Sequence, residues 1–199
     1  MESLLSVNTV ASLLLGISLS AACGLRLFLP FLMLSFAADI GHIGLPADLS
    51  WLSSDQALLM LGIASAVEII GYYIPVIDNI LDPIALPLAT IAGTFVTAST
   101  LPEMNSIAQW TLAAIVGGGS AGLIKSTTSI SRIGSTILSG GLGNFIISTL
   151  EWLGASGLVV LALTLPALAG VFTVALLLFI VYKVWPKITK RFFSTTSPS

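Results

Sequence analysis

The chain is poor in charge. Only 8% of its 199 residues are Asp, Glu, Lys or Arg, whereas 56% are hydrophobic and the mean hydropathy is +1.06. A soluble globular domain carries about 25% charged residues, so this chain has too few to solvate a water-facing surface. The sequence therefore predicts an integral membrane protein.

The chain also lacks the residues that several enzyme classes need. Its single cysteine, Cys23, excludes an internal disulfide, and its single histidine is His42. The sequence contains no H-E-x-x-H, zinc cluster or P-loop, which argues against a metalloenzyme or an ATP-driven motor. Gly118–Gly122 matches the G-x-S-x-G nucleophile elbow, but that motif needs a strand-to-helix turn and a nearby base. We expect no enzyme and no cofactor, and the net charge of −2 argues against a nucleic-acid partner.

Long apolar runs dominate what is present. They fall roughly at 4–23, 27–38, 56–74, 84–100, 107–123, 138–155 and 157–182. Most approach the ~20 residues that a helix needs to span a bilayer. We predict a single all-α domain over 1–199 with about six transmembrane helices. At 1.5 Å per residue, 4–38 is too long for one crossing of a ~30 Å core. We expect a break at Gly24 and Pro30, which leaves 27–38 as a short re-entrant or interfacial segment.

The distribution of charge predicts the orientation. The loop 39–55 carries three aspartates and no Lys or Arg, so we expect it outside. Basic residues at the C-terminal end predict that the tail 184–199 is cytoplasmic, in a bacterial inner membrane. That basic group is Lys183, Lys187, Lys190 and Arg191. Five predicted crossings separate loop from tail, which agrees with both placements. They put Lys125 and Arg132 on the cytoplasmic side, as topology signals or as contacts for an anion.

Two short motifs have the form of a cleavage site and of a helix start. Ser20–Gly24 has the form of a lipoprotein cleavage box, but the first residues lack the positive charge of a signal peptide. We therefore expect the N-terminus to be retained as a membrane segment. Ser53-x-x-Gln56 has the form of a capping box that starts the next helix.

The two halves of the chain share short matches in the same order. They are Gly24-Leu25-Arg26 with Gly122-Leu123-Ile124-Lys125, Glu68-x-x-Gly71 with Glu151-x-x-Gly154, and Leu86-Pro87 with Leu165-Pro166. We predict a duplication with repeats at about 4–100 and 107–183. Three crossings in each half would invert the second half, as in many secondary transporters. In that arrangement 27–38 dips from outside and 125–137 from inside.

Ionisable side chains in or beside the apolar runs are the candidate site residues. Arg26 is an interfacial arginine, the buried partner of Glu68 or Glu151, or a ligand contact. Glu68 lies about 18 Å along its helix, too deep for a short side chain to reach the headgroups. It forms a structural ion pair with Arg26 or serves as a titrating or cation-binding carboxylate. Glu151 lies nearer the end of its run and either reaches the headgroups or shares that function.

Two aspartates form a second candidate group. Asp78 and Asp82 are four residues apart and share a helix face, as a divalent-cation site could use. Asp82 before Pro83 also has the form of a helix N-cap, which we favour for it. Asp78 stays unassigned, and whether the chain binds a metal stays open.

Glycine, serine and threonine are concentrated in 117–144, together with two basic residues. Exposed backbone N–H groups there suit a phosphate-bearing headgroup. Small residues also let membrane helices pack closely. We favour packing for most of them, above all for two stripes, Gly118 with Gly122 and Gly16 with Ser20 and Gly24.

Several longer motifs resemble one family. They are Cys23-Gly24-Leu25-Arg26-Leu27-Phe28-Leu29-Pro30, Glu68-Ile-Ile-Gly-Tyr72-Tyr73-Ile-Pro75-Val-Ile-Asp78-Asn79, Gly117-Gly118-Gly119-Ser-Ala-Gly122 and Gly140-Gly141-Leu-Gly143-Asn144. They are similar to the uncharacterised group of small bacterial membrane proteins known as domain of unknown function 4126. The family pattern includes the positions of Arg26, Glu68, Asp78 and Glu151, whereas Lys125 departs from it. The resemblance implies no activity.

Two classes of function follow from these residues. The first is a small ion-coupled transporter or permease, with Glu68 and Glu151 as coupling carboxylates and Arg26 as counter-ion or anion contact. The second is a non-transporting scaffold or accessory subunit whose charges form internal ion pairs. Handling of a lipid headgroup is a variant of the first. The expected partners are membrane lipids and a small ion or anionic substrate, and a homo-oligomer stays open.

Overall fold

The computed structural model describes residues 7–41, 45, 47–102, 104–184 and 186. These residues form helices and contain no strand, which confirms the all-α prediction. The α-helices are α1 (Val7–Leu25), α2 (Phe28–Asp39), α3 (Asp55–Tyr73), α4 (Pro75–Thr100), α5 (Ser106–Ala113), α6 (Gly119–Ser139), α7 (Leu142–Thr164) and α8 (Pro166–Phe179). Shorter segments are a 3-10 helix, η2 (Ala47–Ser53), and two π-helical turns, η3 (Ala114–Gly118) and η4 (Ile180–Val184).

The surface of the bundle is apolar, which identifies a membrane protein. Five helical stretches in the described residues are long and apolar enough to cross a bilayer. They are Asp55–Tyr73, Leu81–Thr100, Ser106–Ser139, Leu142–Thr164 and Pro166–Lys183. Large apolar side chains point outward from them, among them Met60, Ile107 and Leu138, each more than 70% exposed. Such a surface is stable only when lipid covers it.

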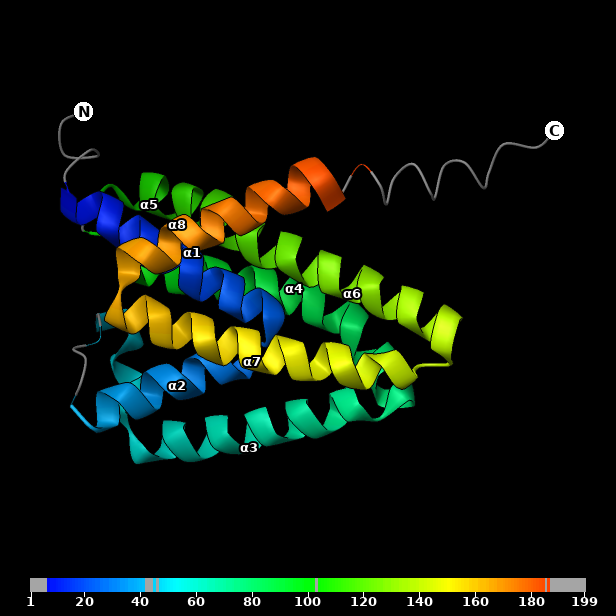
Figure 1. The fold of residues 1–199 in the computed structure, drawn as a ribbon. Coiled ribbons are helices and arrows are strands. Elements are labelled where there is room, and N and C mark those ends of the chain that lie inside the picture. Colours follow the sequence, from blue (N-terminus) through cyan, green and yellow to red (C-terminus); the bar gives the residue numbers. More distant parts are fainter. Residues whose placement is uncertain (1–6, 42–44, 46, 103, 185, 187–199) are drawn as a thin grey trace.

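The first two helices form a hairpin that turns inside the bundle. α1 enters from one end, the chain breaks at Arg26 and Leu27, and α2 returns towards the same end (Figure 1). Their apolar stretches, Thr9–Leu25 and Phe28–Asp39, are shorter than the five spanning stretches. The short segment predicted at 27–38 is therefore a separate helix, α2, and the hairpin turn carries Arg26 into the interior.

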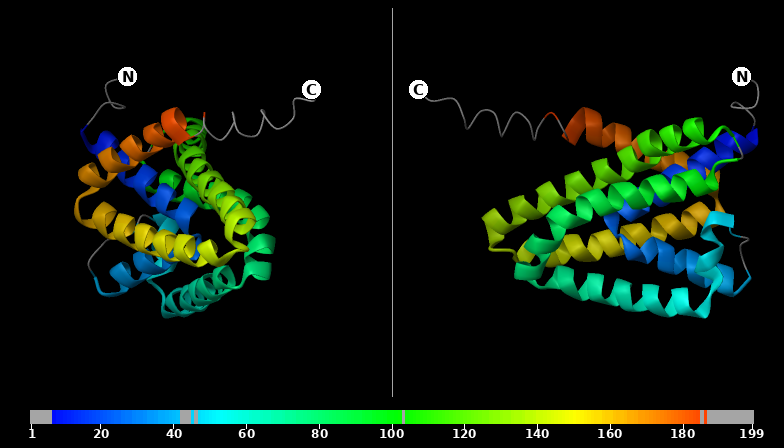
Figure 2. Two further views of the ribbon diagram at one scale, coloured as in Figure 1. Left: turned by 45° about the vertical axis from the view of Figure 1, so that its right-hand side comes forward. Right: turned by 180° about the vertical axis from the view of Figure 1, so that it is seen from behind.

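The remaining helices cross the bundle in alternating directions. α3 starts beside the end of α2, and after four further crossings α8 runs away from that end, towards the end that carries the α6–α7 turn (Figures 1 and 2). The chain before α3 and the end of α8 thus lie on opposite sides, as the sequence predicts. The assignment of these sides to outside and cytoplasm stays a prediction.

Small residues bring α1, α4 and the η3 turn into close contact. The Ser20 hydroxyl donates to the carbonyl oxygen of Gly93 at 2.6 Å and lies 2.7 Å from the Thr97 hydroxyl. A methyl group on Gly24 would lie 2.5 Å from the backbone oxygen of Ala121 in α6. Gly117 leaves equally little room against α4. These contacts confirm packing as the role of the small-residue stripes.

Several predicted boundaries are wrong. Residues 125–137 belong to the continuous helix α6, not to a second dipping segment, because neighbouring helices pack against the small residues and support the helix. Asp82 is not an N-cap, since α4 begins at Pro75 and continues through two internal prolines. The cap of α3 is Ser54, one residue later than predicted, and its hydroxyl accepts from Ala57 N at 3.2 Å.

The boundary between the last two crossings is also displaced, and this affects the proposed repeat. The chain breaks at Leu165 before Pro166, not near 156 as the apolar runs suggested. α3 and α7 run in opposite directions, as do α4 and α8, which suits inverted repeats (Figures 1 and 2). The earlier helices do not correspond, because α1 and α2 form a hairpin whereas α5, η3 and α6 form one crossing. The duplication stays a prediction.

Candidate functional site

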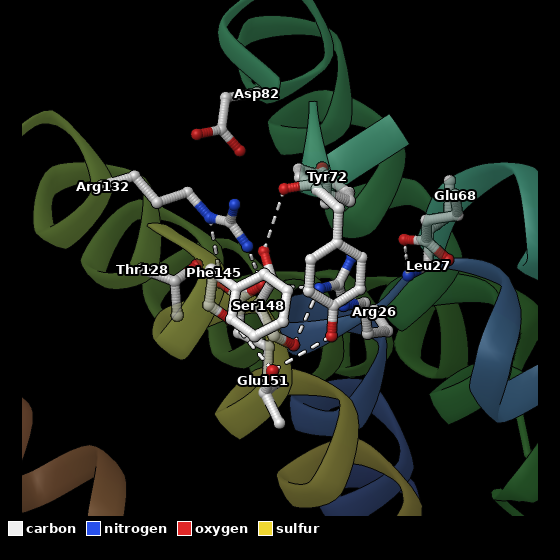
Figure 3. Close-up of polar contacts among 12 residues, drawn as sticks. Arg26, Leu27, Glu68, Tyr72, Asp82, Thr128, Arg132, Phe145, Ser148 and Glu151 are labelled. Atoms are coloured by element: carbon white, nitrogen blue, oxygen red, sulfur yellow. Dashed lines mark hydrogen bonds and ion pairs between the residues drawn. The ribbon is translucent and has the colours of Figure 1, made fainter. Parts of the chain in front are cut away.

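Three cations converge on the ring of Tyr72. The distances to its centroid are 4.5 Å from Arg26 Cζ, 4.7 Å from Lys125 Nζ and 4.5 Å from Arg132 Cζ. The three side chains are at most 3% exposed. They are all the Lys and Arg residues that precede Lys183 in the sequence. The quadrupole of the ring attracts each cation, and this attraction is strongest in a desolvated site. We call these three cations and Tyr72 the Tyr72 cluster; Arg26, Arg132 and Tyr72 are labelled in Figure 3.

Glu151 lies in the middle of α7 and binds two of the cations. Its Oε1 accepts from Arg132 Nε at 3.3 Å, and its Oε2 accepts from Arg132 Nη2 in a closer contact. The same Oε2 lies 3.4 Å from Arg26 Nη2. The contact with Arg132 is thus a two-point pairing of guanidinium and carboxylate, the geometry in which arginine binds anions most strongly. Glu151 is 3% exposed and does not reach the headgroups.

Lys125 is paired with an aspartate on α4. Its Nζ donates to Asp82 Oδ1 at 2.8 Å and to the Tyr72 hydroxyl at 2.9 Å. Asp82 lies inside α4 and not at its start, and the helix directs its carboxylate towards Lys125 on α6. Lys125 and Arg132 are therefore buried members of ion pairs and not only topology signals.

Glu68 has a different partner, the N-terminus of α2. Its Oε1 accepts from the backbone N–H of Leu27 at 2.7 Å and its Oε2 from that of Phe28 at 3.0 Å (Figure 3). The first N–H groups of a helix have no partner within the helix and carry its positive dipole end. A carboxylate from α3 thus holds the hairpin turn in place. In the described part of the chain Glu68 forms no direct ion pair with Arg26, although the two charges interact electrostatically.

Arg26 is the least satisfied of the three cations. Its Nη2 donates to the backbone oxygen of Ser148 at 2.9 Å and faces Glu151. Its Nε and Nη1 have no hydrogen-bond partner among the described residues. These two nitrogens carry three of the five N–H donors of the guanidinium. The buried position is incompatible with the interfacial alternative for Arg26 and leaves donors available inside the bundle.

A cavity of about 330 Å³ lies against the Tyr72 cluster. Its lining consists of Tyr72, Tyr73, Gly140, Gly141, Leu142, Asn144 and Phe145. The lining comes from the end of α3 and from the α6–α7 turn, where both glycines have positive φ, 63° and 93°. The cavity therefore lies at the end of the bundle towards which α8 runs (Figures 1 and 2).

Three of the four predicted site residues lie in or beside this cluster. Arg26 and Glu151 are in contact, and Glu68 lies next to the turn that carries Arg26. The side chain of Asp78 lies outside the described part of the structure, so the paired-aspartate hypothesis has no structural account. Among the described residues no group of three or more His, Cys, Asp and Glu converges as a metal site would require.

The central residue, Tyr72, was missed by reasoning from charge alone. A signal was present, because Tyr72 follows Glu68 by four residues and so lies on the same helix face. The convergence of Lys125 and Arg132 on it was not visible, since it depends on how α6 packs against α3 and α7.

The fold and the cluster define an all-α membrane protein with a buried charged centre beside a helical hairpin. Residues 13–186 match the family described as Domain of unknown function (DUF4126). The match covers most of the 199 residues, and the chain belongs to this family. Neither a curated protein nor a solved structure matches the chain significantly.

Proposed function

We propose that the protein is a small ion-coupled transporter whose path passes the Tyr72 cluster. The observation that carries the proposal is the gathering of six ionisable side chains inside an apolar bundle, beside a hairpin that turns in its interior. They are Arg26, Glu68, Asp82, Lys125, Arg132 and Glu151. Charges within membrane-spanning segments are costly and commonly mark ion or substrate paths. Broken helices in the bundle interior are typical of secondary transporters.

Glu68 is the proposed coupling carboxylate. As an anion it accepts from Leu27 and Phe28 with both oxygens and fixes the start of α2. Once protonated it loses the negative charge that the helix dipole favours, and one oxygen becomes a donor. Proton binding at Glu68 would therefore release the hairpin from α3 and open the cluster to one side. Glu151 serves as the second carboxylate, with Arg26 as counter-ion.

The proposal includes the orientation. The four basic residues at 183–191 favour a cytoplasmic C-terminal tail in a bacterial inner membrane. The cavity beside Tyr72 then faces the cytoplasm. No enzymatic step is assigned to the protein.

The test is flux of H⁺, Na⁺ and K⁺ in proteoliposomes containing wild type, Glu68→Gln or Asp55→Asn. Asp55 is an exposed carboxylate at the start of α3 and provides the matched control. Glutamine keeps one acceptor oxygen for α2, so part of the cap survives. We expect flux from wild type and Asp55→Asn and none from Glu68→Gln, with equal helicity by circular dichroism. Wild-type flux from Glu68→Gln would refute the role of this carboxylate, and absence of flux from wild type would refute coupling to these ions.

A second candidate, a non-transporting scaffold, is favoured by a specific observation. Each of the three carboxylates near the Tyr72 cluster has a partner: Glu68 pairs with the start of α2, Asp82 with Lys125, and Glu151 with Arg132. Such pairing links four helices and the hairpin without any need for a substrate. Under this hypothesis the Glu68→Gln variant loses stability, and no ion flux occurs with either protein.

A further inference from the structure

We propose that the Tyr72 cluster binds a phosphate group, which reaches it through the adjoining cavity. This inference rests on the proposed function, because it names the chemical class of the substrate at the same site. The first observation is that Arg26 has N–H donors without hydrogen-bond partners among the described residues. Nε and Nη1 are buried without a hydrogen-bond partner in the described part of the chain, and Arg26 is 1% exposed. An unsatisfied charged donor in an apolar interior is costly, so the site as it stands is incomplete.

The local charge favours an anion. Three cations lie within 4.7 Å of the ring centre of Tyr72, and two carboxylates, Asp82 and Glu151, pair with them directly. The third carboxylate, Glu68, is bonded to the backbone of α2. One positive charge at the ring thus has no carboxylate of its own, and Arg26 has the open donors.

Phosphate suits this arrangement better than a carboxylate does. Glu151 already supplies a planar carboxylate to Arg132 and Arg26. A tetrahedral oxyanion offers oxygens in several directions and can accept from donors that surround it. Arginine and lysine are the side chains that bind phosphate through charge-assisted hydrogen bonds.

The cavity supplies both a route and a place for the rest of the ligand. Tyr72 belongs to the cluster and also lines the cavity, so this residue joins the two. Tyr73, Leu142 and Phe145 make the other walls largely apolar. An apolar cavity with charge at one end fits a phosphate attached to an apolar group. The phosphate has two possible sources, a phospholipid headgroup or a free phosphate, and the experiment separates them.

The experiment measures binding to the purified protein in detergent by isothermal titration calorimetry. The probes are inorganic phosphate, dihexanoyl phosphatidic acid and, as a control without phosphate, dihexanoyl glycerol. Saturable binding of either phosphate probe, with none of dihexanoyl glycerol, supports the site. Binding of phosphatidic acid alone identifies a lipid phosphate as the source, and comparable binding of inorganic phosphate identifies free phosphate. If neither phosphate probe binds wild type, the inference is overturned.

Two charge-removing variants locate the site. Arg26→Gln removes the open donors, and we expect at least a tenfold rise in Kd. Lys183→Gln removes an equal charge at an exposed position outside the cluster, and we expect no change. If Arg26→Gln does not yield a folded protein, Arg26→Lys takes its place, because it keeps the charge and loses the guanidinium donors. An unchanged Kd in the folded Arg26 variant overturns the inference.

The Glu68→Gln variant separates this inference from the proposed function. The Glu68 carboxylate accepts its two hydrogen bonds from the start of α2, so phosphate binding should persist in this variant. Binding without ion flux in wild type would uphold the site and refute ion coupling. Ion flux in wild type without phosphate binding would uphold ion coupling and refute the phosphate site.

Discussion

The pairing of Arg132 with Glu151 makes a quantitative prediction about stability. Two N–H donors of one guanidinium meet both oxygens of one carboxylate, and the two side chains are at most 3% exposed. Neutral hydrogen bonds between membrane helices contribute about 0.6 kcal/mol on average and about 1.7 at most, because the unfolded chain in a micelle also finds partners. A two-point, charge-assisted pair is about twice as strong as a neutral bond. We therefore expect a coupling energy of about 2–3 kcal/mol between Arg132 and Glu151.

The assay is a double-mutant cycle with Glu151→Gln and Arg132→Gln. The free energy of unfolding is measured in mixed micelles with increasing sodium dodecyl sulfate, followed by circular dichroism. Each single variant should be less stable than wild type by about 3 kcal/mol, since it leaves a buried charge without its partner. The cycle of Asp55→Asn with Lys183→Gln, two exposed charges on separate helices, should give no coupling. A coupling below about 0.6 kcal/mol for the buried pair would refute the reasoning, because the pair would then be no stronger than a neutral bond.

Two further predictions concern packing and the second ion pair. Gly24→Ala places a methyl group 2.5 Å from the backbone oxygen of Ala121, so the free energy of unfolding in the same assay should fall by about 1–3 kcal/mol. Gly62 has open space around it, so Gly62→Ala should be neutral or slightly stabilising. Lys125→Met leaves Asp82 without its partner at 2.8 Å and should lower stability by about 3 kcal/mol; a stability equal to wild type would contradict the assignment of this pair.

The sequence predicted the membrane fold and the depth of Glu68 well, because both follow from local composition, but it did not predict the burial of Lys125 and Arg132. An apolar run of spanning length indicates a helix that crosses the lipid bilayer, and a charged side chain within that helix must face the interior of the protein. Arg26 and Glu68 were found in this way. The need for a break followed from length, since one helix over 4–38 would exceed the bilayer core, and Gly24 with Pro30 indicated its place.

What could not be predicted depends on contacts between helices. Pro83 and the small residues at 119–139 look like helix breakers, yet α4 and α6 continue through them, and the chain turns only at Gly140 and Gly141. In a bundle, neighbouring helices resupply the lost hydrogen bonds and pack against small residues. The convergence of Lys125 on Tyr72 has the same origin. It is set by the rotation of α6 against α3, for which a single sequence holds no direct signal.

The Lys125–Asp82 pair also distinguishes the two classes of function. Replacing a buried ion pair by apolar residues of similar volume is often neutral or stabilising by about 1–4 kcal/mol, since the desolvation cost of the charges disappears. A protein that only scaffolds would then tolerate Lys125→Met combined with Asp82→Leu. If the charges serve transport or anion binding, the double variant should recover the stability that Lys125→Met loses but should show no flux and weaker phosphate binding. A stable double variant with wild-type flux and wild-type phosphate affinity would mean that this pair serves the fold alone.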